Sequence, residues 1–194
     1  MAMRNRKPRL VSKKYIQFLV GVRWTIYVLL SFVFFLIMTS GNPDNIKPVL
    51  LLPFALSLCI FYGEIASAAI GFYCGILIDY AAGRLIGASS LLMVILCVAG
   101  SMLFLQLLRR NIINFMAISA VSTIIYFALD FYLYFSMWDY VGTRTVLLQK
   151  TLPTALLTLA LSPVIYLITK FITQNIGMVD RTILEEQNKN IERV

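Results

Sequence analysis

The sequence contains no histidine, and only 13% of its 194 residues are charged. Histidine is the usual general base and a common metal ligand near neutral pH, so its absence excludes a Ser-His-Asp triad, a histidine proton relay and a His-ligated zinc site. Soluble domains are about 45–50% apolar, whereas 60% of this chain is hydrophobic. At about 20 apolar residues per crossing, that content allows about six spans. The composition excludes a water-soluble enzyme and predicts an all-helical integral membrane protein that needs no cofactor.

Cysteine is also scarce. The three cysteines, Cys59, Cys74 and Cys97, lie inside apolar stretches and show none of the short spacings of a metal or redox motif. Scattered cysteines in apolar helices usually pack as small hydrophobic side chains. The sequence therefore predicts no metal site and no redox site.

Six apolar segments can be marked along the chain. They run over about residues 24–40, 48–62, 65–82, 85–108, 112–138 and 151–173. The first stops at a turn cluster, Gly41-Asn42-Pro43-Asp44, and the second is short and carries Pro53. We expect a six-transmembrane-helix bundle over residues 24–174, preceded by a basic flank, residues 1–23, and followed by a polar tail, residues 175–194.

Basic residues outnumber acidic ones by 17 to 9, and their distribution indicates a membrane topology. The side that holds both termini carries thirteen Lys and Arg, whereas the opposite side carries four: Lys47, Arg84, Arg144 and Lys150. Because cytoplasmic flanks are enriched in Lys and Arg, this bias predicts that both termini are cytoplasmic. The basic flank suits anionic lipid headgroups, and we do not expect a nucleic-acid partner.

The third segment carries a small residue or an aspartate at every fourth position. The series is Ser67, Gly71, Gly75, Asp79, Gly83 and Gly87. Steps of four keep residues on one slowly drifting helix face, so the first three form a groove that a second helix can approach closely. The groove is either a packing stripe within the bundle or a face that admits a ligand or a partner helix.

Two carboxylates interrupt the apolar background, where an ionisable group is costly and is a functional candidate by default. Asp79 and Asp130 both lie toward the outer ends of segments that run from inside to outside. We therefore expect an intramembrane polar cluster of Asp79, Arg84, Asp130 and Tyr126 near the outer face. Its role is either structural pairing or function. Acid–base hydrolysis is disfavoured, because the chain has no histidine, metal motif or polar catalytic loop.

The fifth and sixth segments each carry a polar stripe at helical spacing. The stripes are Ser119, Ser122, Thr123, Tyr126, Asp130 and Tyr134, and Thr151, Thr154, Thr158, Ser162, Tyr166, Thr169 and Thr173. Polar side chains avoid lipid, so the stripes should face other helices or a cavity. They indicate either hydrogen bonds between helices or a partly hydrated pocket.

The stretch from Gly71 to Leu92 resembles the signature of MreD, a family of bacterial rod shape-determining membrane proteins. That signature has a G-x3-G-x3-D core, then small residues, then another glycine before the next apolar helix. The matching residues are Gly71, Gly75, Asp79 and Gly87, with Gly83 as an additional match. Arg84 corresponds to no position of the pattern. The size, the basic N-terminus and the six-span layout agree over nearly the whole chain.

The resemblance implies a non-enzymatic scaffold of the cell-elongation machinery in the bacterial cell membrane. MreD-like proteins bind the bitopic protein MreC and, with it, act on the glycan polymerase RodA, its partner class B penicillin-binding protein, and MreB filaments beneath the membrane. Their fold is similar to the S components of energy-coupling-factor vitamin transporters, so the alternative is a small-molecule-binding transporter subunit. S components usually dock their coupling partner through an A-x3-A stripe in the first helix. Residues 24–35 contain no alanine, which weighs against transport.

The charge bias predicts which loops are exposed outside the cell. In a chain whose native cysteines are replaced, single cysteines at Asn45 and Thr143 should react with a membrane-impermeant maleimide added to intact cells. Cysteines at Asn5 and Asn188 should react only after the membrane is permeabilised. Labelling of Asn188 from outside would contradict the six-span topology.

Overall fold

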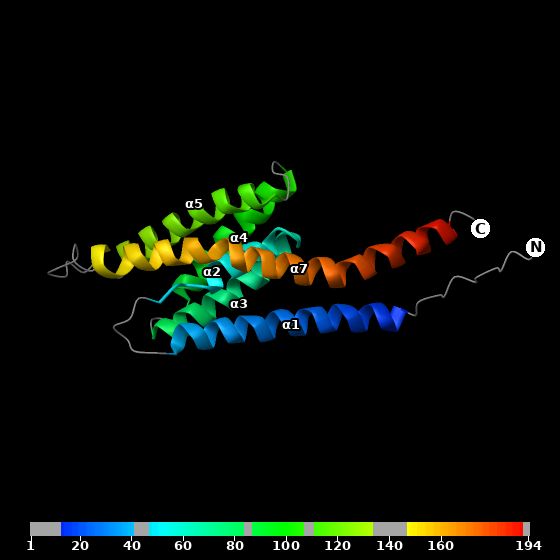
Figure 1. Ribbon diagram of the computed structural model, residues 1–194, viewed down its shortest axis with the longest axis horizontal. Coiled ribbons are helices and arrows are strands. Elements are labelled where there is room, and N and C mark those ends of the chain that lie inside the picture. The colour runs from blue at the N-terminus through cyan, green and yellow to red at the C-terminus, as the bar shows by residue number, and fades with distance from the viewer. Residues whose placement is uncertain (1–12, 41–46, 84–86, 107–110, 134–146, 192–194) are drawn as a thin grey trace, which may run out of the picture.

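The computed structural model describes residues 13–40, 47–83, 87–106, 111–133 and 147–191 as an elongated bundle of helices (Figure 1). The elements are α1 (Lys13–Thr39), α2 (Leu51–Cys59), α3 (Glu64–Ala82), α4 (Ala88–Gln106), α5 (Ile112–Phe131), the π-helical segment η2 (Leu147–Thr151) and α7 (Leu152–Ile191). Within these ranges there is no β-strand. Among the described residues, five helices are long and apolar enough to cross a membrane, which confirms the predicted multi-pass helical membrane protein.

The second segment, residues 48–62, is the one that departs most from the prediction. Its helix, α2, has only 9 residues, so it rises about 13 Å, well short of a hydrocarbon core of about 30 Å. Every residue of α2 is buried, and α2 contacts each of the other five α-helices. Protein therefore encloses α2 on all sides, as a short helix at membrane depth requires. The segment is a central core element rather than a full-length span.

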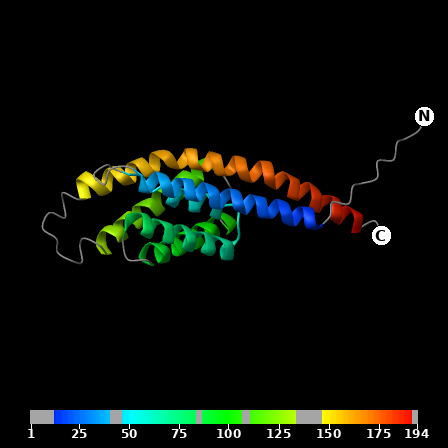
Figure 2. The same ribbon diagram turned by 90° about the horizontal axis from the view of Figure 1, so that it is seen from below.

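α2 nevertheless runs in the direction opposite to that of α1 and α3, the helices before and after it in the chain. Lys47, just before α2, lines the same cavity as Met38 near the end of α1. Tyr62, just after α2, packs its ring against Trp24, which lies fourteen residues before Met38 on α1, with centroids 5.2 Å apart. The chain therefore passes six times between the two ends of the bundle, and the start of α1 and the end of α7 lie at one end (Figure 2).

The first and last helices are longer than the predicted spans. α1 begins at Lys13, inside the predicted flank, and α7 continues beyond residue 174 to Ile191. α7 also passes through Pro163 without a break. Both helices extend beyond the rest of the bundle at the end that holds the termini (Figure 1). The predicted flank and tail are thus partly helical continuations of the two spans.

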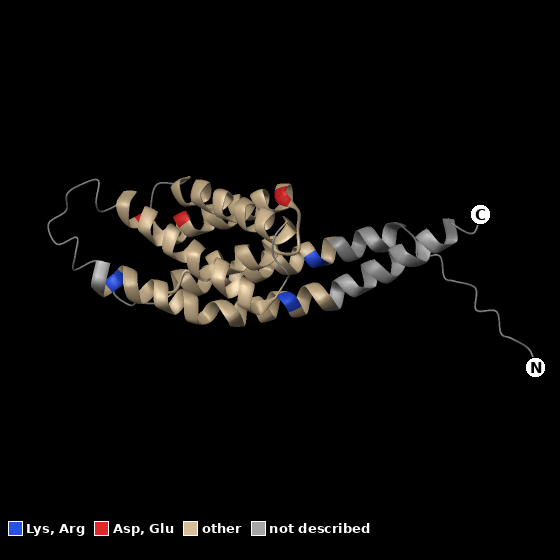
Figure 3. Cartoon of the chain, turned by 90° about the horizontal axis from the view of Figure 1, so that it is seen from above, with Lys and Arg blue, Asp and Glu red and all other residues tan. Residues whose placement is uncertain are grey.

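The core of the bundle is apolar with hydroxyl groups among its side chains, and the outer surface of the bundle is apolar as well. The interior contains buried hydroxyl side chains on every α-helix, whereas large apolar side chains are exposed along α1, α3, α4, α5 and α7. Many of the hydroxyls donate to a carbonyl of their own helix, such as Thr169 to Ile165 and Ser162 to Leu159. The coloured charged residues lie toward the two ends of the bundle (Figure 3). This distribution suits a surface that contacts lipid.

Both predicted polar stripes face inward. Ser119, Ser122, Thr123 and Tyr126 are buried on α5, and Thr158, Ser162, Tyr166 and Thr169 are buried on α7; Tyr134 lies outside the described residues. Three hydrogen bonds connect α7 to other segments. The Val49 amide donates to Thr158 Oγ1 at 3.0 Å, the Tyr27 and Thr173 hydroxyls are 2.7 Å apart, and the Ser162 hydroxyl donates to Met116 Sδ on α5 at 3.5 Å. The stripes thus include bonds that hold α7 to α1 and to the start of α2.

The glycine groove of α3 is occupied by α4 of the same chain. A Cβ atom on Gly75 would lie 2.3 Å from Ser90 Cα, and one on Gly71 would lie 2.8 Å from the Met93 carbonyl oxygen. Only glycine permits this approach, because any side chain would collide with α4 backbone. α3 and α4 form the most extensively packed helix pair of the bundle.

Filling this contact should separate the two helices. Gly75→Leu places four carbons against the backbone at Ser90, and we expect it to lower the free energy of unfolding by at least about 1–3 kcal/mol. Gly100→Ala is the matched control, because its Cβ would lie at an ordinary 3.6 Å from Leu56 Cδ2; it should unfold like wild type. Thermal unfolding in detergent distinguishes them. If the Gly75→Leu protein melted at the same temperature as the Gly100→Ala protein, α3 and α4 would not be in close contact.

Candidate functional site

Asp79 is completely buried near the end of α3, and its partners are backbone amides. Its carboxylate oxygens accept hydrogen bonds from the N–H of Gly87 at 2.7 Å and from that of Ser89 at 3.2 Å. These residues flank Ala88, where α4 begins, and the first N–H groups of a helix have no carbonyl partner within it. Asp79 therefore caps α4 from the preceding helix, where the helix dipole also favours a negative charge.

Gly83 and Gly87 serve the turn between the two helices. α3 ends at Ala82, so neither glycine continues its packing face. Gly83 adopts φ 62° and donates its N–H to the carbonyls of Asp79 and Tyr80, and Gly87 adopts φ 118°. Residues that carry a side chain rarely adopt these positive φ values. A Cβ on either residue would meet no atom within 4 Å, so backbone conformation rather than space requires glycine here.

Tyr126 joins α5 to this turn. Its hydroxyl, which is buried, donates to Ser89 Oγ at 3.0 Å. The amide of the same Ser89 donates to Asp79. Asp79, Ser89 and Tyr126 thus form a continuous hydrogen-bonded connection across α3, α4 and α5. Of the four residues that were predicted to cluster, Asp79 and Tyr126 both form a hydrogen bond with Ser89.

The other two predicted members are placed differently. Asp130 follows Tyr126 by one helical turn on α5, is half-buried and lines a cavity. Arg84 lies outside the described residues, so its predicted pairing with Asp79 stays a prediction. The two carboxylates therefore have distinct surroundings: backbone amides around Asp79, and the wall of a cavity for Asp130.

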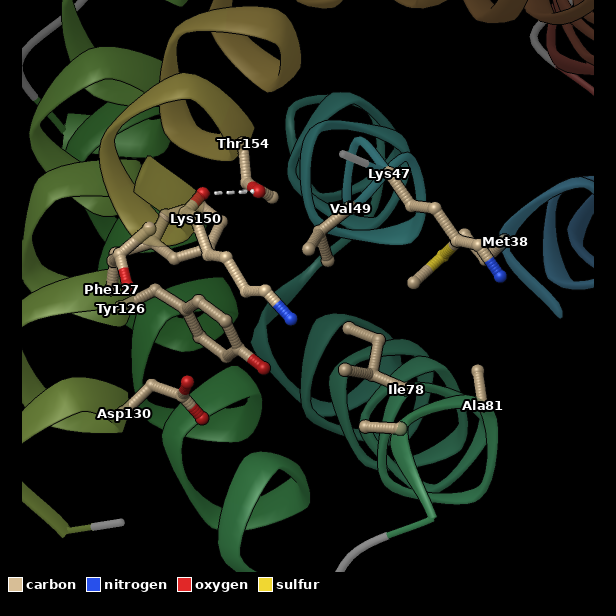
Figure 4. Close-up of a pocket in the computed structure, with 12 residues that line it drawn as sticks. Met38, Lys47, Val49, Ile78, Ala81, Tyr126, Phe127, Asp130, Lys150 and Thr154 are labelled. Atoms are coloured by element: carbon tan, nitrogen blue, oxygen red, sulfur yellow. Dashed lines mark hydrogen bonds between the residues drawn. The ribbon is translucent and has the colours of Figure 1, made fainter. Parts of the chain in front are cut away.

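This cavity, hereafter the end cavity, lies at the end of the bundle away from the termini and measures about 250 Å³. Its walls come from α1, the lead into α2, α3, α5, η2 and α7. The lining residues are Met38, Lys47, Val49, Ile78, Ala81, Ala82, Tyr126, Phe127, Asp130, Lys150, Thr151 and Thr154. Figure 4 shows the Lys150 side chain extending into the space between Val49 and Tyr126, with Asp130 below the Tyr126 ring.

The charged groups of the end cavity suit binding rather than bond cleavage. Two lysines and one aspartate line it. Among the described residues, no group of three His, Cys, Asp or Glu side chains is arranged to hold a metal ion. The Thr154 hydroxyl donates to the Lys150 carbonyl at 2.6 Å and so stabilises the backbone that carries this lysine. Figure 4 shows the Lys47 side chain running toward Met38, away from the Lys150 ammonium.

Two features of the structure were not predicted. Lys47 and Lys150 were interpreted from the sequence only as charges that indicate membrane topology. Both lie next to the ends of predicted spans, and these ends meet at one end of the bundle. The thiols also meet: Cys74 and Cys97 both neighbour Cys59. These three cysteines come from α2, α3 and α4 and are all buried and free. Their spacing of fifteen and 23 residues carries no signal of this contact, which depends on helix packing.

Comparison with known proteins identifies one family. The family model described as rod shape-determining protein MreD matches residues 13–175, which include all five candidate membrane spans. No curated protein and no solved structure matches the chain significantly.

The Asp79 cap predicts a graded loss of stability. Asp79→Leu leaves two buried N–H groups without an acceptor, at about 1–3 kcal/mol for each. Asp79→Asn keeps one acceptor oxygen and is a competent cap, so we expect a loss of only about 1 kcal/mol. Unfolding of the purified variants in detergent measures both, with Asp130→Asn as the control for charge removal at a half-buried carboxylate. An Asn variant that stays folded but loses as much stability as the Leu variant would show that the charge, rather than the cap, matters.

Proposed function

Because the chain belongs to the MreD family of rod shape-determining membrane proteins, we propose that it acts as a non-enzymatic scaffold of the bacterial cell-elongation machinery. In this role it holds an MreC-like, single-span protein in the cell membrane. Through that partner it acts on RodA, on a class B penicillin-binding protein and on MreB filaments at the cytoplasmic face. The observation that carries the proposal is the family match over the whole membrane-spanning part of the chain.

The structure supports a binding role through its surface. The glycine groove, a candidate for recruiting a partner helix, is filled by α4 of the same chain. A partner helix must therefore pack on the lipid-facing sides of the outer helices. α1 is the least buried of the five spans. Without a hydrophobic driving force between helices in lipid, close packing and hydrogen bonds must supply the attraction.

The end that holds the termini supports contact with anionic lipid. Arg23 on α1 and Lys170 on α7 are half-buried there. The Arg23 guanidinium lies 5.4 Å from the centroid of the Tyr62 ring, and Lys170 Nζ lies 5.9 Å from that of Tyr166. Long basic side chains beside aromatic rings are typical of a membrane interface. With this end at the cytoplasmic face, both cations can meet anionic headgroups.

One observation favours the transporter alternative, namely the end cavity. A small-molecule-binding S component needs such a space, but ligand pockets usually measure about 300–1,000 Å³, and this cavity is smaller at about 250 Å³. Family membership favours the scaffold. The transporter alternative requires a tightly bound ligand on the purified protein and association with a coupling subunit and two ATPases.

Co-purification with photo-crosslinking tests the scaffold. Co-expressed with an MreC-like partner, the protein should form a complex that survives size exclusion, and its depletion should turn rod-shaped cells round. A photoreactive amino acid at the exposed positions Phe32, Ile95, Ile124 or Leu156 should crosslink the partner from at least one helix. The same group at Met93, buried between α3 and α4, should give no crosslink.

Two results would contradict this proposal. A ligand retained on the purified protein, together with normal cell shape after depletion, would favour the transporter. A partner crosslink obtained from Met93 alone would show that the glycine groove opens to a partner.

A further inference from the structure

A second cavity, of about 150 Å³, lies between α1 and α3, and the buried helix α2 forms its floor. It is hereafter the lateral groove, and its lining includes Trp24 and Ser31 of α1, Phe54 and Leu58 of α2, and Ala69 and Tyr73 of α3. We propose that the lateral groove holds an acyl chain of a membrane phospholipid. This inference requires only that the chain spans a membrane, so it does not depend on the scaffold function.

The lateral groove lies at the depth of lipid acyl chains. Trp24 lies three residues into the apolar span Gly21–Thr39 of α1, and Ser31 lies near the middle of that span. The seven residues from Trp24 to Ser31 rise about 10 Å along the helix, and half of a hydrocarbon core measures about 15 Å. The lateral groove therefore covers most of the depth of one leaflet, on the side of the membrane that holds the termini.

The lining of the lateral groove favours hydrocarbon over water. Ser31 Oγ donates to the Val28 carbonyl at 2.7 Å and lies 3.5 Å from the Tyr73 hydroxyl oxygen. The hydroxyl of Tyr27, which also contributes to the lining, lies 2.7 Å from that of Thr173. A buried water needs about two to four polar partners, and these hydroxyls are already bonded within the protein. An alkyl chain needs no such partner.

The lateral groove is continuous with the surface that faces lipid. Val28 and Phe32 of α1 are exposed, and so are Phe72 and Tyr73 of α3. α1 lies along one edge of the bundle beside α3 (Figure 1), and it is the least buried of the five spans. Lipid chains that cover these two helices therefore reach the groove directly.

The size of the lateral groove favours a single chain over a helix. An α-helix with its side chains is about 10–12 Å wide, whereas the groove has a volume of only about 150 Å³. Beyond the groove, the rings of Phe35 on α1 and Tyr80 on α3 are 5.9 Å apart, so the two helices are in contact there. Ala69 has the smallest side chain of the lining and keeps the groove open. Lipid covers this surface with or without a protein partner, so we assign the groove to an acyl chain.

Photolabelling from within the bilayer tests the proposal. The purified full-length protein is reconstituted in vesicles of phosphatidylethanolamine and phosphatidylglycerol, with a phosphatidylglycerol that carries a diazirine in the middle of one acyl chain. Labelled residues are located by proteolysis and mass spectrometry. We expect labels on Phe54 and Leu58, because these buried residues of α2 line the lateral groove. Leu51 and Leu52 are equally buried on α2 but do not line the groove, and should carry no label.

Two alanines provide a matched pair of variants. Ala69→Phe should abolish the labelling of α2, because the ring fills the lateral groove. Ala117→Phe, at an exposed alanine of α5, should be labelled on α2 like wild type. Ala69→Leu fills less of the groove and should give an intermediate loss. Exposed Ile124 on α5 should be labelled in every variant, which controls for insertion into the bilayer.

Three results would overturn the proposal. The first is a wild-type protein that is labelled at exposed residues but not on α2. The second is an Ala69→Phe protein that elutes from size exclusion like wild type and keeps its α2 labels. The third is loss of the α2 labels when an MreC-like partner is reconstituted with the protein, since the groove would then hold a side chain of the partner.

Discussion

Two backbone N–H groups at the start of α4, those of Gly87 and Ser89, donate to the buried carboxylate of Asp79. Inside a membrane, where water cannot replace a lost partner, an unsatisfied amide costs several kcal/mol, so α4 must begin where Asp79 lies. The glycine contact at Gly75 prevents the two helices from separating further along the pair. Together the two contacts make α3 and α4 a single rigid unit, against which α2 and α5 pack.

This rigid unit explains how a small protein whose core includes many hydroxyl groups remains folded in lipid. Several of its buried hydroxyl groups, such as that of Thr169, donate to a carbonyl of their own helix, and a few bonds, such as Tyr126 to Ser89, connect different helices. The completely buried α2 fills the centre. The outer helices are thus held in fixed positions and present a preformed apolar surface to the membrane. A preformed surface suits a scaffold, because little ordering is required when a partner helix binds.

The sequence predicted the features that composition and helical period control. These include the membrane class, the inward polar stripes and the groove of Gly71 and Gly75. It did not predict that α2 would be a short buried helix, because an apolar run looks the same whether lipid or protein surrounds it. The spacing of small residues at every fourth position also predicted that Gly83 and Gly87 continue the face of Gly71 and Gly75. In the structure α3 ends at Ala82, and both glycines lie in the turn that follows. The end cavity is lined by Lys47 and Lys150, which are distant in sequence and reach one end of the bundle only through the packing of six passes.

The amide protons of Gly87 and Ser89 offer the most direct test of the Asp79 cap. Neither has a helical carbonyl to bond, since both stand at the start of α4, so their protection from exchange should depend on Asp79. Residue-resolved hydrogen–deuterium exchange should find both amides protected in the wild-type protein. In Asp79→Leu they should exchange at least about tenfold faster, while amides in the middle of α4 keep their protection. Equal protection of the two amides in wild type and in Asp79→Leu would contradict the account.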